Sequence, residues 1–258
     1  WRVKAVTLTG SEPAGRSVAE NAGRNIKKTV MELGGSDAFL VMPSADVDEA
    51  VATGILARVN NNGQSCIAGK RFIVHTEIYD EFVEKFTATM ASLVVGNPIE
   101  RATQVGPLAI ENGVRDLEQF VADARAKGAR ILTGGDRLDR PGFFFPPTVI
   151  DQITPEMRIF AEEAFGPLAS VYRADSLDHA ISLANDSPFG LSSAIWTNDK
   201  AEQEAAVSKL DAGAVFVNGM TISYPELPFG GIKNSGYGRE LGAPGIREFT
   251  NMKTVWKA

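Results

Sequence analysis

The sequence is 258 residues long, 44% of its residues are hydrophobic, and its net charge at pH 7 is −6. This is enough for one large globular domain or two smaller ones. The acidic balance, without any basic run, argues against nucleic acid as a partner, and no apolar stretch reaches the length of a membrane span. The single cysteine, Cys66, excludes an internal disulfide framework and favours a reducing, cytoplasmic compartment. With only two histidines beside it, the sequence predicts no metal site.

The N-terminal segment predicts a β-α-β unit. Apolar and β-branched residues at 3–8 predict a strand, and residues 10–15 predict a turn that opens a helix reaching about Ala22, with Pro13 in its first turn. Residues 29–33 predict the second strand. Because the chain starts inside a strand pattern without an initiator methionine, we expect it to be a fragment of a longer protein.

Strand and helix patterns alternate along the rest of the chain. Strands are predicted at residues 38–42, 71–74, 129–133, 168–172, 193–196 and 214–217. Helices are predicted from a cap at Ser44 or Asp46 to about Asn60, and at residues 78–92, 111–127, 177–185 and 201–210. This alternation is typical of an α/β fold around a mainly parallel sheet. Residues 229–245 predict a long ordered loop or a domain boundary, and residues 249–256 predict a final strand.

Cys66 is the first candidate for chemistry. A lone cysteine is usually a small buried apolar residue. Here it follows Asn62, Gly63 and Gln64 rather than an apolar run, and this polar setting favours a reactive thiol. The thiolate is the reactive form, so we expect a helix N-terminus or nearby donors to lower the pKa of Cys66.

Glu32 is the second candidate. It lies at the end of a predicted strand and is followed after one residue by Gly34 and Gly35. The carboxyl ends of strands are where α/β sheets form their active-site crevices. Taken alone, the local sequence fits a solvated glutamate at the sheet edge equally well.

Three further segments are weak signals when each is taken alone. Residues 10–15 resemble a phosphate-binding turn at a helix start, but they lack the Gly-x-Gly-x-x-Gly pattern, and a plain tight turn fits them better. Residues 162–167 fit a helix end, and residues 228–231 and 235–240 fit flexible loops.

Together, these segments resemble the aldehyde dehydrogenase superfamily over nearly the whole chain. The shared blocks, in the order of that family, are Gly-Ser-x-x-x-Gly, Glu-Leu-Gly-Gly, Gly-Gln-x-Cys, Glu-Glu-x-Phe-Gly-Pro and Pro-Phe-Gly-Gly. Each block is weak, but five in order are strong. The chain is most similar to bacterial members grouped with succinate-semialdehyde dehydrogenases. The resemblance implies an oxidoreductase that converts an aldehyde, with succinate semialdehyde as the candidate, to a carboxylate with NAD or NADP.

The resemblance implies the catalytic roles. Cys66 would attack the aldehyde carbon to form a thiohemiacetal, hydride would pass to the nicotinamide, and a thioester would remain. Glu32 would activate the water that hydrolyses this thioester. Glu240 would lie in a proton path near Glu32, and Phe229 would line the aldehyde tunnel.

The resemblance also implies the cofactor contacts. Gly10, Ser11 and Gly15 would contact the cofactor pyrophosphate. Glu163 would hold the nicotinamide ribose, with Phe165 alongside. The residues that distinguish NAD from NADP in the family lie in an N-terminal region that this chain lacks.

The layout that the resemblance implies has three parts. Residues 1–34 would be the end of a Rossmann-like cofactor domain, and residues 35–234 would be a three-layer catalytic domain. Residues 235–258 would return to the cofactor domain and pair across a subunit interface. The full-length parent is expected to be a homodimer or homotetramer, and this chain alone is expected to be inactive as a dehydrogenase.

Two other functions stay open, and one departure from the family bears on the substrate. Asn60 stands where succinate-semialdehyde enzymes often carry an arginine. The first alternative is a Cys-Glu esterase or thioesterase without a cofactor, which would turn over esters without nucleotide. The second is a non-catalytic folded fragment, in which Cys66 would react no faster than a buried thiol.

Overall fold

The computed structural model describes residues 2–258. β1 (Ala5–Thr9), α1 (Glu12–Arg24) and β2 (Lys28–Glu32) form the predicted β-α-β unit, in which the two strands are parallel. The Ser11 hydroxyl accepts a hydrogen bond from the Ala14 amide, and Pro13 lies in the first turn of α1, so the expected start signals do form this helix. A third strand from the far end of the chain, β12 (Gly236–Tyr237), pairs antiparallel with β2.

The main sheet has seven strands in the order β10-β9-β3-β4-β7-β6-β5. In chain order they are β3 (Asp37–Val41), β4 (Gly69–His75), β5 (Arg130–Thr133), β6 (Thr148–Asp151), β7 (Leu168–Ala174), β9 (Ser193–Trp196) and β10 (Val215–Val217). Neighbouring strands are parallel except β5 and β6. The prediction of an α/β fold around a mainly parallel sheet is therefore confirmed.

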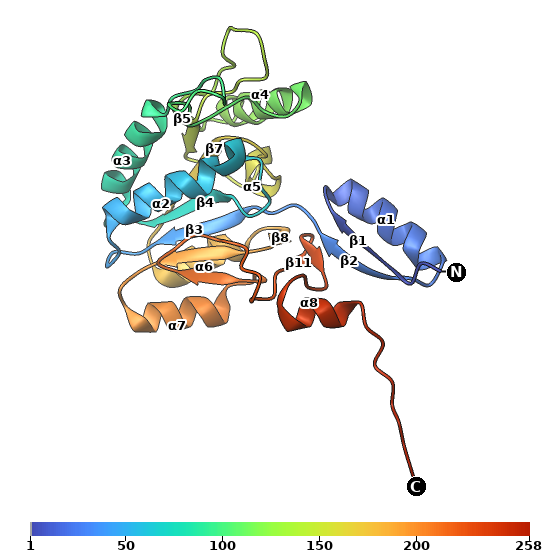
Figure 1. The fold of residues 1–258 in the computed structure, drawn as a ribbon. Helices are drawn as coiled ribbons and strands as arrows, with labels where there is room; N and C mark the ends of the chain where they lie inside the picture. The colour runs from blue at the N-terminus through green and yellow to red at the C-terminus, as the bar shows by residue number, and fades with distance from the viewer. Residues whose placement is uncertain (1) are drawn as a thin grey trace.

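Helices cover both faces of this sheet and make three layers (Figure 1). α2 (Val47–Val59) and α3 (Tyr79–Ser92) pack on one face, and α6 (Leu177–Asn185) and α7 (Lys200–Lys209) pack on the other. Residues of β3 alternate between the two cores: Phe39 packs with α2 and α3, whereas Leu40 packs with α6 and α7. Both faces are buried, as parallel sheets require.

A third apolar cluster supports one side of the site. α4 (Glu111–Ala126) and α5 (Arg158–Ala161) pack with β6 through residues that include Leu117, Phe120 and Ile150. The segment that follows α5 carries Glu163 and Gly166, and Gly166 lies directly against Leu117. This cluster thereby fixes the segment that holds Glu163. Among residues 2–258, no helix combines the length and apolarity that a membrane crossing needs.

The C-terminal region differs from the expectation in two ways. Residues 229–245 are ordered but are more than a loop: they include β11 (Ile232–Lys233), which pairs with β8 (Phe189–Gly190), together with β12 and the start of α8 (Gly242–Glu248). The strand predicted at residues 249–256 is not formed in this chain, where residues 251–258 have no regular structure and are exposed. No described strand of the chain lies beside this segment to pair with its backbone groups.

Candidate active site

A cavity of about 640 Å³ lies where the β-α-β unit meets the larger body. The residues around it come from the turn after β1, the segment after β2, the loop that carries Cys66 and the segment after α5: Thr9, Gly10, Ser11, Leu33, Gly34, Gln64, Ser65, Cys66, Glu163 and Phe165. A second cavity of about 530 Å³ shares Ser11, Gly34, Gln64, Glu163 and Phe165 with it. Segments that are far apart in the sequence are thus brought together around one thiol.

The loop before Cys66 is held in a tight, unusual backbone conformation. In the short 3₁₀ segment η1 (Asn60–Gly63), Asn61, Asn62 and Gly63 all have positive φ angles, of 52°, 57° and 75°. The buried Arg58 donates a hydrogen bond from Nη2 to the Gly63 carbonyl oxygen at 2.7 Å. This turn ends three residues before Cys66, which lines the cavity.

The polar neighbours of Cys66 anchor its loop rather than bind its thiol. The Asn62 side-chain oxygen accepts a hydrogen bond from the Gly106 amide at 2.6 Å, and its amide group donates to the Pro107 carbonyl at 3.1 Å. The Gln64 side-chain oxygen accepts from the Ala109 amide at 2.9 Å. The sequence suggests these side chains as the reactive setting of the thiol, whereas the structure assigns them to loop anchoring.

The protonation of Cys66 corrects one expectation. The residue is partly buried, and burial raises the pKa of its thiol. The positive charge of Lys70 opposes this rise, whereas the negative charges of Asp37 and Glu163 add to it. A hydrogen bond from the Ile67 backbone is a nearby donor of the expected kind and lowers the pKa, but burial outweighs it, so the net shift is upward, contrary to the expectation from the sequence. The described chain therefore holds Cys66 as a neutral thiol near pH 7.

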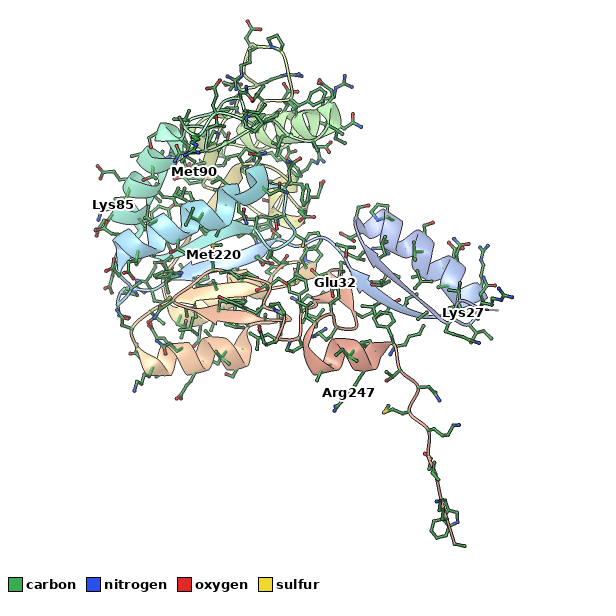
Figure 2. All side chains as sticks on the ribbon, viewed as in Figure 1. Lys27, Glu32, Lys85, Met90, Met220 and Arg247 are labelled. Atoms are coloured by element: carbon green, nitrogen blue, oxygen red, sulfur yellow. The ribbon has the colours of Figure 1, made fainter. Side chains whose placement is uncertain are left out.

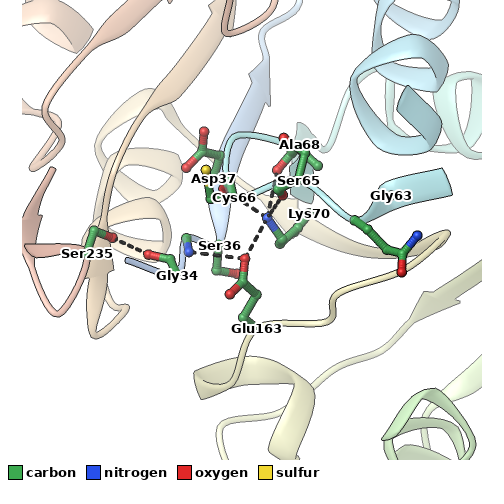
Figure 3. Close-up of polar contacts among 12 residues, drawn as sticks. Gly34, Ser36, Asp37, Gly63, Ser65, Cys66, Ala68, Lys70, Glu163 and Ser235 are labelled. Carbon is green, nitrogen blue, oxygen red and sulfur yellow. Dashed lines mark hydrogen bonds and ion pairs between the residues drawn. The ribbon is translucent and has the colours of Figure 1, made fainter. Parts of the chain in front are cut away.

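Glu163 is held toward the cavity by a buried cation. Its Oε1 atom lies 3.2 Å from the Lys70 ammonium and accepts a hydrogen bond from the Gly35 amide at 3.2 Å. Lys70 also donates to the backbone around Cys66 (Figure 3). Phe165, two residues on, is 45% exposed and lines the same cavity. No local pattern in the sequence places Lys70 at the site.

Glu32 is buried without hydrogen-bond partners. Its side chain is 2% exposed, so it is not a solvated residue of the sheet edge, and neither carboxylate oxygen has a hydrogen-bond partner among the described residues. Burial raises the pKa of Glu32 to about 8; the charge of Glu240 adds to this rise and that of Arg239 opposes it. Figure 2 places Glu32 where the β-α-β unit joins the larger body.

The Glu32 carboxylate faces the glycine-rich segment rather than the cavity. A Cβ atom on Gly230 would lie 2.7 Å from Oε1 of Glu32. Glu32 is not among the residues that line the cavity around Cys66. Phe229 and Glu240 pair through their backbones, with the Phe229 amide 2.8 Å from the Glu240 carbonyl oxygen. The charge of Glu240 acts on Glu32, and Phe229 does not line the described cavity.

Of the three predicted pyrophosphate contacts, two line the cavity. Gly10 and Ser11 do so at the N-terminus of α1, and the Gly10 amide donates to the Glu32 carbonyl at 3.0 Å. Gly15 lies one turn further on and is buried, and a Cβ atom there would come within 2.6 Å of the Leu33 methyl groups. The absence of a side chain at Gly15 therefore lets α1 approach the segment after β2.

Fold and site together define a class of protein. The chain belongs to the aldehyde dehydrogenase family, whose model matches residues 1–255. It is 62% identical over 257 residues to a succinate-semialdehyde dehydrogenase [NADP(+)] from Mycobacterium tuberculosis and, with the same identity, to one from Mycobacterium leprae. The match covers 100% of this chain and 56% of each relative, so the chain spans about half the length of the curated relatives it matches.

A solved structure of a similar protein has the same fold over nearly the whole chain. The chain superposes on succinic semialdehyde dehydrogenase from Streptococcus pyogenes, solved in complex with NADP+, with a TM-score of 0.96 and 40% sequence identity. The match covers 99% of this chain and 56% of that one. The expected fold, a three-layer α/β domain of this family beside part of a second unit, is confirmed.

Proposed function

We propose that this chain carries the catalytic machinery of an NAD(P)-dependent dehydrogenase that oxidises an aldehyde to a carboxylate. The observation that carries the proposal is the single cavity that joins Cys66 to Gly10, Ser11 and Glu163. A thiol lines this cavity together with a helix N-terminus and a fixed carboxylate, and the last two are groups suited to a pyrophosphate and a ribose hydroxyl. A cofactor-independent esterase would have no use for these last two features.

The residues at the cavity fit the cofactor that the family uses. Gly10 and Ser11 line the cavity and directly precede α1. At this helix N-terminus, backbone N–H groups and the helix dipole favour phosphate oxygens. Glu163 Oε1 is fixed by Lys70 and the Gly35 amide, and the carboxylate can accept hydrogen bonds from a ribose. The curated mycobacterial relatives are named as NADP(+) enzymes, which favours NADP over NAD.

The chemistry runs through Cys66 and Glu32. Cys66 Sγ bonds to the aldehyde carbon as the C=O π bond breaks, and the thiol proton passes to the aldehyde oxygen, which gives a thiohemiacetal on the enzyme. A nicotinamide bound at the cavity would accept the hydride when this adduct is oxidised to the thioester. Glu32 then takes a proton from water as the water oxygen attacks the thioester on Cys66. The C–S bond breaks, the carboxylate leaves and the thiol is restored.

Glu32 must move to act as this base. Its carboxylate faces Gly230, and it is held in a site that favours the protonated form. We infer that the side chain turns toward Cys66 after the acyl group has formed. Glu240 lies near enough to influence the charge of Glu32, which supports its place on a path for the proton that Glu32 releases.

Succinate semialdehyde is the candidate substrate, because both mycobacterial relatives are named for it. Asn60 lacks the charge of the arginine that succinate-semialdehyde enzymes often carry there, and Arg58 does not replace it: Arg58 is fully buried and donates to the Gly63 carbonyl. The distal carboxylate of this substrate would therefore bind other groups.

We propose the following layout for the complete enzyme. Residues 1–34 belong to the cofactor-binding unit, residues 35–234 to the catalytic domain, and residues 235–258 to a tail that returns to the cofactor unit. The pairing of β12 with β2 supports this return. The exposed residues 249–258 are proposed to pair with a second copy in a homo-oligomer.

The test uses the purified chain together with whatever precedes it in its gene. Succinate semialdehyde and NADP+ should yield reduced nicotinamide and succinate, and Cys66→Ala should abolish both products. An ester substrate without nucleotide is tested in parallel. Ester hydrolysis that depends on Cys66, with no aldehyde oxidation under any nucleotide, would replace the proposal with the esterase function.

A further inference from the structure

Lys70 is a buried cation at the centre of the site. It lies in β4 and is 2% exposed. Its ammonium donates to the carbonyl oxygens of Ser65 at 2.8 Å, Cys66 at 3.0 Å and Ala68 at 3.4 Å (Figure 3). The same nitrogen lies 3.2 Å from Oε1 of Glu163. One ammonium group therefore joins the backbone that carries the nucleophile to the carboxylate at the cofactor side of the cavity.

This arrangement is costly unless all its partners are present. Burial lowers the pKa of Lys70, and the charges of Glu163 and Asp37 oppose that effect. An ammonium has three donors, and here four acceptors surround it, so the bonds to Ala68 and Glu163 share donors with the shorter ones. A replacement at this position cannot satisfy these acceptors without a cation of the same length.

We propose that Lys70 is a positioning residue that ties the Cys66 loop to the Glu163 carboxylate, so that thiol placement and cofactor binding depend on the same ammonium group. The coupling to cofactor rests on the proposed function, whereas the coupling to the thiol does not. A purely structural lysine would stabilise the fold and leave the titration of Cys66 and the KM for nucleotide unchanged.

The buried arginine nearby does not perform this task. Arg58 donates to Gly63 on the other side of the loop, and its Nε and Nη1 atoms have no hydrogen-bond partner among the described residues. Within the described chain, Glu163 has an ion pair with Lys70 and none with Arg58. Loss of the Lys70 charge would leave Glu163 with the Gly35 amide as its remaining hydrogen-bond partner in the described structure.

The first experiment measures the thiol. Cys66 is the only cysteine, so iodoacetamide reports on it alone in the 258-residue chain. Lys70→Met removes charge and donors, and Lys70→Gln removes the charge but keeps donors. We expect the pH midpoint of alkylation to rise by about one unit in both variants, because a nearby positive charge favours the thiolate. Lys85→Met, at an exposed lysine paired with Asp48 and Glu81, is the matched control and should not shift it.

The second experiment measures the cofactor in the same variants of the active protein. The KM for nucleotide should rise about tenfold in Lys70→Met, with a smaller change in kcat, because Glu163 loses a charge-assisted contact. Glu163→Gln should raise the KM similarly, and the double variant should be no worse than either single one. Additive effects would show that Lys70 does not act through Glu163.

The outcomes separate the two proposals. A shifted thiol titration in a chain that oxidises no aldehyde would leave the Lys70 assignment standing and remove the proposed function. Normal titration and normal KM in folded variants of an active enzyme would overturn the assignment alone.

Folding is checked by thermal melting. If both variants melt below the assay temperature, Lys70→Arg is measured instead: it keeps the charge, so the titration should stay near that of the wild type while the KM rises, and a shifted titration would overturn the proposal.

Discussion

Gly63 lies directly against the backbone of Gly166, so closely that a Cβ atom on Gly63 would overlap the Gly166 carbonyl group. Gly63 also has a φ of 75°, in the left-handed region that favours glycine. Gly63 precedes Cys66, and Gly166 follows Glu163. The Cys66 thiol and the Glu163 carboxylate therefore keep their separation through a contact that only a glycine permits.

Gly63→Ala should weaken the site more than the fold. We expect a loss of about 2–4 kcal/mol in the free energy of unfolding, from steric overlap and an unfavourable φ, together with a loss of most dehydrogenase activity. Chemical denaturation and nucleotide reduction assays measure the two effects. Gly23→Ala is the matched control: Gly23 lies in α1, a methyl group there would meet no neighbouring atom within 4 Å, and the change should be neutral or slightly stabilising. Equal effects of the two changes would contradict this explanation.

The pH dependence of turnover should follow the ionisation of Glu32. Burial raises its pKa to about 8, so near pH 7 the Glu32 carboxyl group is protonated in most molecules and cannot take a proton from water. We expect the hydrolysis of the acyl-enzyme to speed up about tenfold for each pH unit below this pKa and to level off above it. Rapid-quench measurement of thioester decay between pH 6 and 10 checks the profile. A rate independent of pH over this range would show that the buried position with the raised pKa does not limit Glu32 as the base.

Ionisation of Glu32 should also lower the stability of the fold at high pH. Its pKa in the folded state lies above the ordinary value of 4.5, so its contribution to stability is complete below pH 4.5 and is lost as the pH rises through about 8. Glu32→Gln mimics the protonated form. The variant should match the wild type near pH 5 and exceed it by on the order of 2 kcal/mol at pH 9. Urea titrations at both pH values test this, and a variant that is less stable at pH 9 would refute the argument.

The regular elements follow from the sequence because their signals are local. The cap at Ser11, the continuous apolar run of β3 and the apolar periodicity of α6 all lie within their own segments. β6 escapes prediction because it is four residues long and directly follows Pro146 and Pro147. The two-residue strands β8, β11 and β12 exist only through pairing with distant parts of the chain, which no local pattern reveals.

The site likewise contains some residues that the sequence identifies and others that it does not. Cys66, Glu163 and Gly10 carry motif signals, and the structure gathers them at one cavity. Lys70 carries none: a lysine in a strand is ordinarily exposed, and its inward position depends on Glu163, which is distant in the sequence. The sequence also contains no sign that Asn62 would anchor its loop to Gly106. Such roles depend on partners that only the tertiary fold supplies.

Cys66 should react slowly with alkylating agents at neutral pH. Burial raises the pKa of its thiol, so a smaller fraction is thiolate than in a model thiol with a pKa of about 8.5. We expect iodoacetamide to label the 258-residue chain several-fold more slowly than free cysteine at pH 7, with a rate that climbs as the pH rises. Mass spectrometry follows the reaction, and Cys66→Ala gives the background. Labelling faster than the model thiol would mean that the site lowers the pKa instead.

The C-terminal tail should set the oligomeric state. Met252, Val255 and Trp256 are 97%, 70% and 84% exposed in the single chain, and the backbone of residues 251–258 takes part in no regular structure. Apolar side chains on an unpaired extended segment favour pairing with another chain.

Deletion of residues 250–258 should therefore convert the proposed homo-oligomer to monomers, and Trp256→Ala should weaken association by at least tenfold, since a buried tryptophan at an interface contributes about 2 kcal/mol or more. Sedimentation velocity over a concentration series measures both. Ile26→Ala, at a residue 94% exposed elsewhere on the surface, is the matched control and should leave association unchanged. An unaltered oligomer after the deletion would assign the interface to another surface.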